Sequence, residues 1–214
     1  MPLPWNRIGA ISGILFAILF VVGTMLAADQ PDSGDPDADW LSYFNDDGRL
    51  LRNLIGGYLW VVSALLFIVF LVVLVRHLRQ VSRGDDVPAG IVLVSGGVFV
   101  TMLLVGAFAV VAVPAGIKFG DTPVPSPDFG RMLPQIGFGA LLVGGGFSAL
   151  LLIATTSWVI LRTHMLATWI AVLGFVAAII LIFGALFIPM IALPIWMLVI
   201  SGALLRRPEV TASP

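Results

Sequence analysis

The aspartates of the stretch DQPDSGDPDADW, residues 29–40, are the side chains whose spacing could do chemistry. The stretch holds five aspartates and no basic residue. Four acids in and just after it match positions 1, 3, 5 and 12 of a calcium-binding loop, namely Asp35, Asp37, Asp39 and Asp46. The motif fails where Trp40 replaces the glycine of its sharp turn and where Asp replaces the bidentate Glu. We therefore interpret the acid as loop solvation and helix capping, with calcium as the alternative.

Three arginines form a second candidate site. In RHLRQVSR, Arg76, Arg79 and Arg83 recur at i, i+3 and i+7, which places them on one helical face directly after an apolar run. Each basic residue close to an anionic membrane surface contributes about 1 kcal/mol of attraction. We expect these arginines to contact anionic lipid head groups.

The two histidines do not have the neighbours of a metal site. His77 and His164 both lie close to arginine, and the chain has no cysteine that could supply a thiolate ligand. No Ser, His and Asp set falls on a plausible common face. We expect no metal ion, no cofactor and no catalytic residue.

Small residues recur at helical spacing in two apolar runs. One row contains Gly9 and Gly13, and the other contains Ala140, Gly144 and Ser148, each repeating every four residues. Such rows let helix backbones approach closely inside a membrane. We interpret them as packing faces within a bundle, with a groove for a lipid tail or a partner's helix as the alternative.

The composition is that of a membrane protein. Apolar residues make up 59% of the 214 and charged residues 11%, against roughly 45–50% and 25% in soluble domains. The charges stand in loops, tails or at the ends of apolar runs, so the runs contain no ionisable side chain that could serve an ion-coupled transporter or a Schiff base. The net charge of −1 gives no reason to expect a nucleic-acid partner.

Six apolar runs are long enough to cross a membrane as helices. They cover residues 8–27, 54–75, 90–115, 134–161, 166–187 and 188–205. The sequence therefore predicts an all-α, polytopic transmembrane helix bundle that forms a single integral membrane domain over residues 1–214. The last run is short and contains Pro189 and Pro194, so five spans followed by a re-entrant segment is the alternative.

The polar segments divide into two external loops, 28–53 and 116–133, and a cytoplasmic tail, 206–214. In the first loop, ADWLSYFNDDGRLLRN predicts a short amphipathic helix at the membrane surface, with Asp37 or Asp39 as N-cap and Gly48 at its end. The second loop is rich in Pro and Gly and predicts no element of its own.

The distribution of basic residues predicts the orientation. With the N-terminus in the cytoplasm, seven of them lie inside: Arg7, Arg76, Arg79, Arg83, Arg162, Arg206 and Arg207. Four lie outside: Arg49, Arg52, Lys118 and Arg131. The positive-inside rule therefore favours a plasma-membrane protein with both termini in the cytoplasm.

The layout also resembles a family. A first span, an Asp-rich loop, WLSYFNDDGRLLRNLIGGYLWVV and a closing LFIPMIALPIWMLVISGALLRR are similar to small polytopic membrane proteins of high-GC Gram-positive (actinobacterial) bacteria. This resemblance implies a compartment and a topology, but no functional residue.

These observations favour a non-enzymatic accessory or scaffold subunit that binds membrane lipids or a larger envelope complex. One alternative is a carrier or binding protein for a neutral or lipidic molecule. A second is an interfacial lipid-modifying enzyme that uses Asp46, Asp47, Arg49 and Arg52. The sequence leaves the oligomeric state open.

Overall fold

The computed structural model describes residues 5–82, 84–183 and 188–206. Within these ranges all regular secondary structure is helical. In chain order the elements are α1 (Trp5–Ala27), α2 (Asp37–Phe44), α3 (Asp47–Val81), α4 (Val87–Phe119), α5 (Pro127–Gly139), the π-helical η1 (Ala140–Gly145), α6 (Gly146–Thr163), α7 (Thr168–Leu181), the 3₁₀ turn η3 (Ile188–Ile191) and α8 (Ala192–Leu205).

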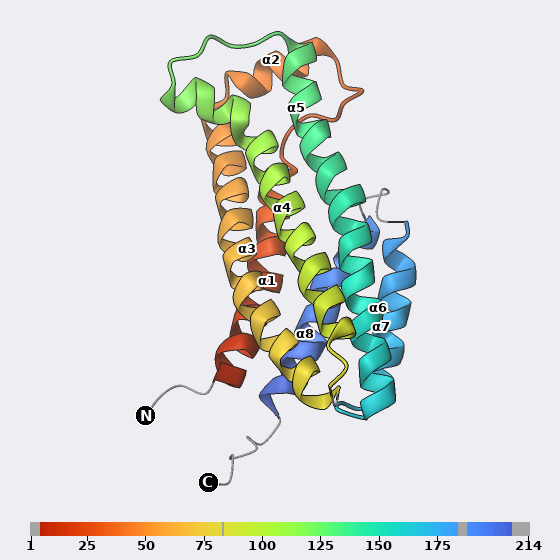
Figure 1. Cartoon of the computed structure of the whole chain (residues 1–214). Helices are drawn as coiled ribbons and strands as arrows, with labels where there is room; N and C mark the ends of the chain where they lie inside the picture. Colours follow the sequence, from red (N-terminus) through yellow and green to blue (C-terminus); the bar gives the residue numbers. More distant parts are fainter. Residues whose placement is uncertain (1–4, 83, 184–187, 207–214) are drawn as a thin grey trace.

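The long helices stand side by side along one axis. Figure 1 shows α3, α4 and the continuous α5–η1–α6 run as roughly parallel rods, with α1 and α8 behind them and α2 across one end. The start of α1 and the end of α8 lie at the opposite end. We call the end that carries α2 the cap end. The other, which carries Arg76, Arg79, Arg162 and Arg206, is the arginine end.

Within the described residues, four helical stretches are long and apolar enough to cross a membrane. They are α1, α3, α4 and the 37-residue run Pro127–Thr163. The structure confirms the prediction of an all-helical, multi-pass membrane-type bundle at this level. It does not establish six spans, because α7 and α8 have only 14 residues each. That is about 21 Å of helix, less than the roughly 30 Å of a hydrocarbon core.

The fourth span is longer than predicted. We expected it to begin at residue 134, but the helix begins at Pro127, within the predicted loop 116–133. Proline suits the first helical turn because it has no N–H to leave unpaired. At the other side of that loop α4 continues to Phe119. The irregular connection at the cap end is therefore confined to residues 120–126.

Aromatic side chains fill the centre of the bundle. Phe16 of α1, Phe67 of α3 and Phe99 of α4 are buried, with ring centroids 5.0 Å apart for Phe16–Phe67 and 4.9 Å apart for Phe67–Phe99. Nearer the cap end α1 and α3 meet at two glycines, where a Cβ on Gly56 would lie 2.7 Å from the carbonyl oxygen of Gly23. Close backbone contact and ring packing together hold the long helices in register.

Candidate functional site

The first row of small residues lies inside the bundle. A Cβ on Gly9 would lie 2.6 Å from Cβ of Val73, and one on Gly13 would lie 2.7 Å from Cδ2 of Phe70 and would also meet Ser201 Oγ. Gly9 and Gly13 therefore face α3 and α8 of the same chain. They are not available to a separate partner.

The second row lies along η1 and the start of α6, where it is half-buried. A Cβ on Gly144 would lie 2.8 Å from Sδ of Met102 in α4, and Ser148 Oγ donates a hydrogen bond to the Gly144 carbonyl, at 2.6 Å. Ala140 at its upper end is partly exposed. This row packs on α4 along one edge and leaves the other edge open.

A contact of helix backbone with helix backbone was not anticipated from the sequence. A Cβ on Gly137 of α5 would lie 2.9 Å from the carbonyl oxygen of Gly106 in α4. Neither glycine belongs to the rows that we singled out by their four-residue spacing. The signal was an isolated glycine in each of two apolar helices, and it becomes interpretable only once the two helices are known to be neighbours.

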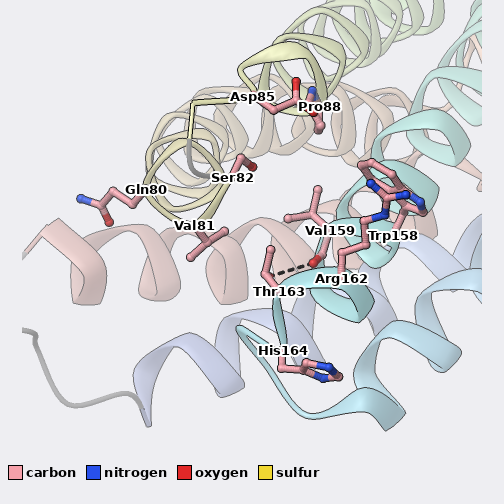
Figure 2. Close-up of a pocket in the computed structure, with 10 residues that line it drawn as sticks. All are labelled: Gln80, Val81, Ser82, Asp85, Pro88, Trp158, Val159, Arg162, Thr163 and His164. Carbon is pink, nitrogen blue, oxygen red and sulfur yellow. Dashed lines mark hydrogen bonds between the residues drawn. The ribbon is translucent and has the colours of Figure 1, made fainter.

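At the arginine end a wide groove separates the α3–α4 turn from the end of α6. Its cavity volume is about 650 Å³, and Figure 2 shows the residues that line it. Arg162 lies over the ring of Trp158, with its guanidinium carbon 4.3 Å from the ring centroid. Ser82 and Asp85 come from the opposite wall. The groove thus combines a positioned cation with polar side chains.

A second groove adjoins the first through His164. It measures about 730 Å³ and lies between the start of α7 and the end of α8, with Trp169, Leu198 and Gly202 in its walls and Arg206 at its edge. His164 ends α6 in the left-handed conformation, with φ at 51°, and so turns the chain into α7. The two grooves together place cationic side chains beside an apolar surface.

The predicted arginine cluster is only partly described. Arg76 and Arg79 are exposed near the end of α3, while Arg83 lies outside the described residues. Nε of Arg79 is 3.9 Å from Oδ1 of Asp86. Among the described cations at this end, it is the only one within 4 Å of a carboxylate; the others are Arg7, Arg76, Arg162 and Arg206. Arg162 and Arg206 line the grooves, although the spacing argument had not selected them.

At the cap end every basic residue has an internal partner. Arg52 pairs with Asp29 at 3.0 Å, and Lys118 pairs with Asp47 at 2.6 Å. Arg49 donates to the Asp29 carbonyl at 2.9 Å. Asp29 of the acidic stretch thus binds the start of α3, a role that we had not assigned to it, and Asp47 joins the start of α3 to the end of α4.

Arg131 of α5 makes the largest set of these contacts. Its Nη2 donates to the Asp35 carbonyl at 2.8 Å and to Oδ1 of Asp37 at 2.5 Å, and its Nη1 to Oδ1 of Asp128 at 3.2 Å. The contacts with Asp35 and Asp37 join α5 to the start of α2 across more than ninety residues of sequence. They fold the acidic loop down onto the bundle.

The predicted surface helix is α2, but its apolar face packs on protein. Trp40, Tyr43 and Phe44 are buried in a small cluster with Leu50 of α3 and Val113 of α4. Burial raises the pKa of the Tyr43 phenol. The helix lies on the projecting ends of α3, α4 and α5. The sequence had not indicated that these three helices extend so far.

The capping residues also differ from the prediction. The N-cap of α2 is Pro36 without a side-chain hydrogen bond, and the helix ends before Asn45. Gly48, expected at its end, lies instead in the first turn of α3. Asp46 caps α3 by accepting from the backbone N–H of Gly48 at 2.9 Å and of Arg49 at 3.1 Å. These hydrogen bonds, that of Arg49 foremost, hold the pKa of the Asp46 carboxyl below its usual value.

The acidic stretch does not take up the geometry of a calcium loop. Asp37 and Asp39 lie in the first turn of α2, and Asp37 is bound to Arg131. Oδ2 of Asp35 accepts from the backbone N–H of Asp32 at 2.8 Å. Across the described residues, no three His, Asp or Glu side chains are grouped so that they could hold a metal ion.

The residues proposed for an interfacial enzyme all have structural contacts. Asp46 caps α3, Asp47 pairs with Lys118, and Arg52 pairs with Asp29. The guanidinium of Arg49 lies over the ring of Tyr43, 5.1 Å from its centroid. The arrangement accounts for these four residues as parts of the cap.

No protein-family model, curated protein or solved structure matches this chain. A functional assignment therefore rests on the geometry of the two ends.

Proposed function

We propose that the chain is a non-enzymatic, multi-pass plasma-membrane protein that binds anionic membrane lipids at its arginine end. The observation that carries this proposal is the pair of adjoining grooves in which Arg162, His164 and Arg206 border an apolar wall. An anionic lipid has the complementary form, because its charged head group and its hydrocarbon chains are joined in one molecule.

The positions of the side chains suggest how such a lipid would sit. Trp158 holds the guanidinium of Arg162 by a stacking contact that leaves the edge of the guanidinium free to donate to phosphate oxygens. Arg206 lines the second groove. Hydrocarbon would follow Trp169 and Leu198, whose apolar surface faces that groove. The described part of the chain places no carboxylate within 4 Å of Arg162 or Arg206 to compete with the lipid.

The proposed topology is six spans with both termini in the cytoplasm. The unit η3–α8, over Ile188–Leu205, combines four 3₁₀ residues with 14 α-helical residues. At about 2.0 Å and 1.5 Å per residue it is about 29 Å long, which suits a hydrocarbon core. An even number of spans agrees with the start of α1 and the end of α8 lying at one end. The positive-inside rule assigns that end to the cytoplasm, where the anionic lipids lie.

An accessory role in a larger membrane complex is the second candidate. Large apolar side chains are exposed on the outer faces of the helices, among them Phe108 of α4 and Ile179 of α7, which are 66% and 60% exposed. Lipid tails or the helices of a partner would cover them equally well. A carrier for a neutral molecule has less support than an anionic-lipid site, because a neutral ligand would make no use of the cations at the arginine end.

The test is lipid retention by the whole chain in nanodiscs that contain phosphatidylglycerol and phosphatidylcholine. Native mass spectrometry would count the retained molecules of each lipid. We expect Arg162→Gln and Arg206→Gln each to reduce phosphatidylglycerol retention about fivefold, the factor that corresponds to 1 kcal/mol. Lys118→Gln at the cap end is the control for a lost charge and should leave retention unchanged.

A steric variant tests the groove without a change in charge. A Cβ on Gly202 meets nothing within 4 Å, so Gly202→Phe can fill the second groove without a clash at the backbone. Gly97 of α4 is equally open and distant from it in sequence, so Gly97→Phe is the matched control. Equal retention by both variants would contradict the proposal. A protein that copurifies stoichiometrically from native membranes, with no selected lipid, would support the accessory role instead.

A further inference from the structure

A third groove lies at the cap end, beneath the loop that follows α1. It has a cavity volume of about 570 Å³, which is within the usual range for small-molecule sites. Gln30 and Trp40 line it on the loop side, and Arg131, Gln135 and Phe138 line it on the side of α5. The lining combines polar side chains with apolar surface.

Two buried polar atoms on the lining residues have no hydrogen-bond partner. They are Oε1 of Gln30, which can only accept, and Nε of Arg131, which can only donate. The Nη atoms of Arg131 are already bound to Asp35, Asp37 and Asp128. A hydroxyl group can satisfy either kind of atom, because it both accepts and donates hydrogen bonds.

An apolar crevice adjoins this groove through Leu142, which lines both. Its volume is about 170 Å³, and its walls include Phe20 of α1, Trp60 of α3 and Pro194 of α8. The polar atoms of Thr24 and Trp60 are bound to each other, with 3.1 Å between Nε1 and Oγ1. The crevice therefore offers hydrocarbon contact and no unpaired polar group on these two residues.

The wall that carries Leu142 is the π-helical turn η1. Single π turns within α-helices occur frequently at functional sites. Here the turn follows Gly139, which lines the third groove, and it contains Leu142, which lines both the groove and the crevice. The irregular stretch of the helix therefore lies where the groove and the crevice adjoin.

The charge of the cap end selects the head group. Nine aspartates surround it, at positions 29, 32, 35, 37, 39, 46, 47, 121 and 128, against the four cations Arg49, Arg52, Lys118 and Arg131. The net formal charge of the cap end is therefore −5, so an anionic head group would be repelled. A neutral head group carries no such penalty.

We propose that the cap groove and its apolar crevice bind a neutral amphiphile with a hydroxyl-bearing head and a hydrocarbon chain, of the acylglycerol class. The head hydrogen-bonds to Gln30 and Arg131, and part of the chain passes Leu142 into the crevice beside Trp60. This site is at the opposite end from the proposed anionic-lipid site and does not depend on it.

The experiment uses a monoacylglycerol with a photoactivatable diazirine in the middle of its acyl chain. The probe is added to the full chain in phosphatidylcholine nanodiscs, irradiated, and its attachment sites are mapped by mass spectrometry. We expect labelling of residues 20–25, 141–142 and 190–194. Unlabelled monoolein should compete at least fivefold better than oleate, which has the same chain and an anionic head. Equal competition, or labels spread evenly along the apolar surface, would overturn the proposal.

Two variants test the volume of the groove and the hydrogen-bond acceptor in it separately. A Cβ on Gly139 meets nothing within 4 Å, so Gly139→Phe fills the groove, and Gly97→Phe is the same change on an open face of α4. The first should reduce the mapped labelling at least fivefold and the second should not. Gln30→Met keeps the side-chain length and removes the acceptor, and we expect it to abolish the preference for monoolein over oleate. If Gly139→Phe and Gln30→Met were both labelled like the wild type, the proposed site would be wrong.

Discussion

The two ends of the bundle use their cations in opposite ways. At the cap end Arg49, Arg52, Lys118 and Arg131 all bind carboxylates or carbonyls of the same chain. At the arginine end the one described ion pair, between Arg79 and Asp86, is long and exposed at 3.9 Å. The cations at the cap end are thus paired within the chain, where they hold a loop against the helices. Charge at the arginine end remains directed toward the surroundings, which is what a lipid-binding surface requires.

Among these predictions, the largest effect should come from removing a buried apolar side chain at the cap end. Trp40 is 2% exposed in the cap cluster, and removal of a buried Trp side chain costs about 3–5 kcal/mol. We expect Trp40→Ala to release α2, so that its amides exchange as fast as those of an open loop while the spans stay protected. Hydrogen exchange followed by mass spectrometry measures this. Trp158→Ala at the arginine end, where the ring is 38% exposed, is the control and should change exchange little.

Arg131 should come next. Loss of hydrogen bonds to a charged group costs about 1.5–3 kcal/mol, and the Arg131 side chain is 18% exposed. We expect Arg131→Gln to weaken protection of residues 30–37 by about 2 kcal/mol in exchange experiments, discounted from the upper end because Asp37 and Asp128 are largely exposed. Arg76→Gln removes a cation of the other end and should leave protection unchanged. An equal loss in both variants would erase the contrast between the ends.

Ionic strength should also separate the ends. An increase from 0.1 M to 1 M salt shortens the Debye length from about 10 Å to about 3 Å. Selective retention of phosphatidylglycerol should therefore fall severalfold, because it rests on exposed cations. Exchange in α2 should change much less, because its apolar cluster and the shielded Arg131 hold it. Salt-insensitive retention would place the lipid selectivity in the apolar groove instead of the arginines.

The smallest effect should be a pH dependence at the start of α3. The pKa of Asp46 is lower in the folded chain than in the unfolded one, so the carboxylate stabilises the helix at neutral pH. The stabilisation is lost as the pH falls below the ordinary value of about 3.9 and through the folded pKa. Amide exchange in the first turn of α3, corrected for the intrinsic rate, should increase at that pH. Asp46→Asn retains an N-cap that cannot ionise, so the pH dependence should disappear.

The sequence predicted the parts of the fold that depend on long apolar runs. A run such as 54–75 has few alternatives to a membrane helix, and α3 contains it. The pattern of Trp40, Tyr43 and Phe44 was less informative, because an apolar helix face looks the same whether lipid or protein covers it. The decisive fact was that α3, α4 and α5 project far enough to receive α2. The length of α5 could not be predicted because Pro127 and Pro134 suggested a turn, whereas both lie within the helix.

The candidate sites were harder to predict because they depend on neighbours that are distant in sequence. Arg131 contacts residues more than ninety positions away, and no local pattern distinguishes it from Arg76. The acidic stretch was correctly singled out as unusual, and its separation from the arginine-bearing end was anticipated. Its binding to the cations beside it was not, since a count of charges does not say which of them will meet.

The length of α3 also relates the protein to the thickness of its membrane. The apolar run within α3, residues 54–75, has 22 residues, or about 33 Å at 1.5 Å per residue. A hydrocarbon core of about 33 Å, near that of thick membranes, would accommodate α3 upright, whereas an average core of about 30 Å would require a tilt of about 25°. Because α3 packs along its length on α1 and α4, the whole bundle would lean with it. In the proposed topology, bilayer thickness would therefore set the inclination of the cap end relative to the membrane.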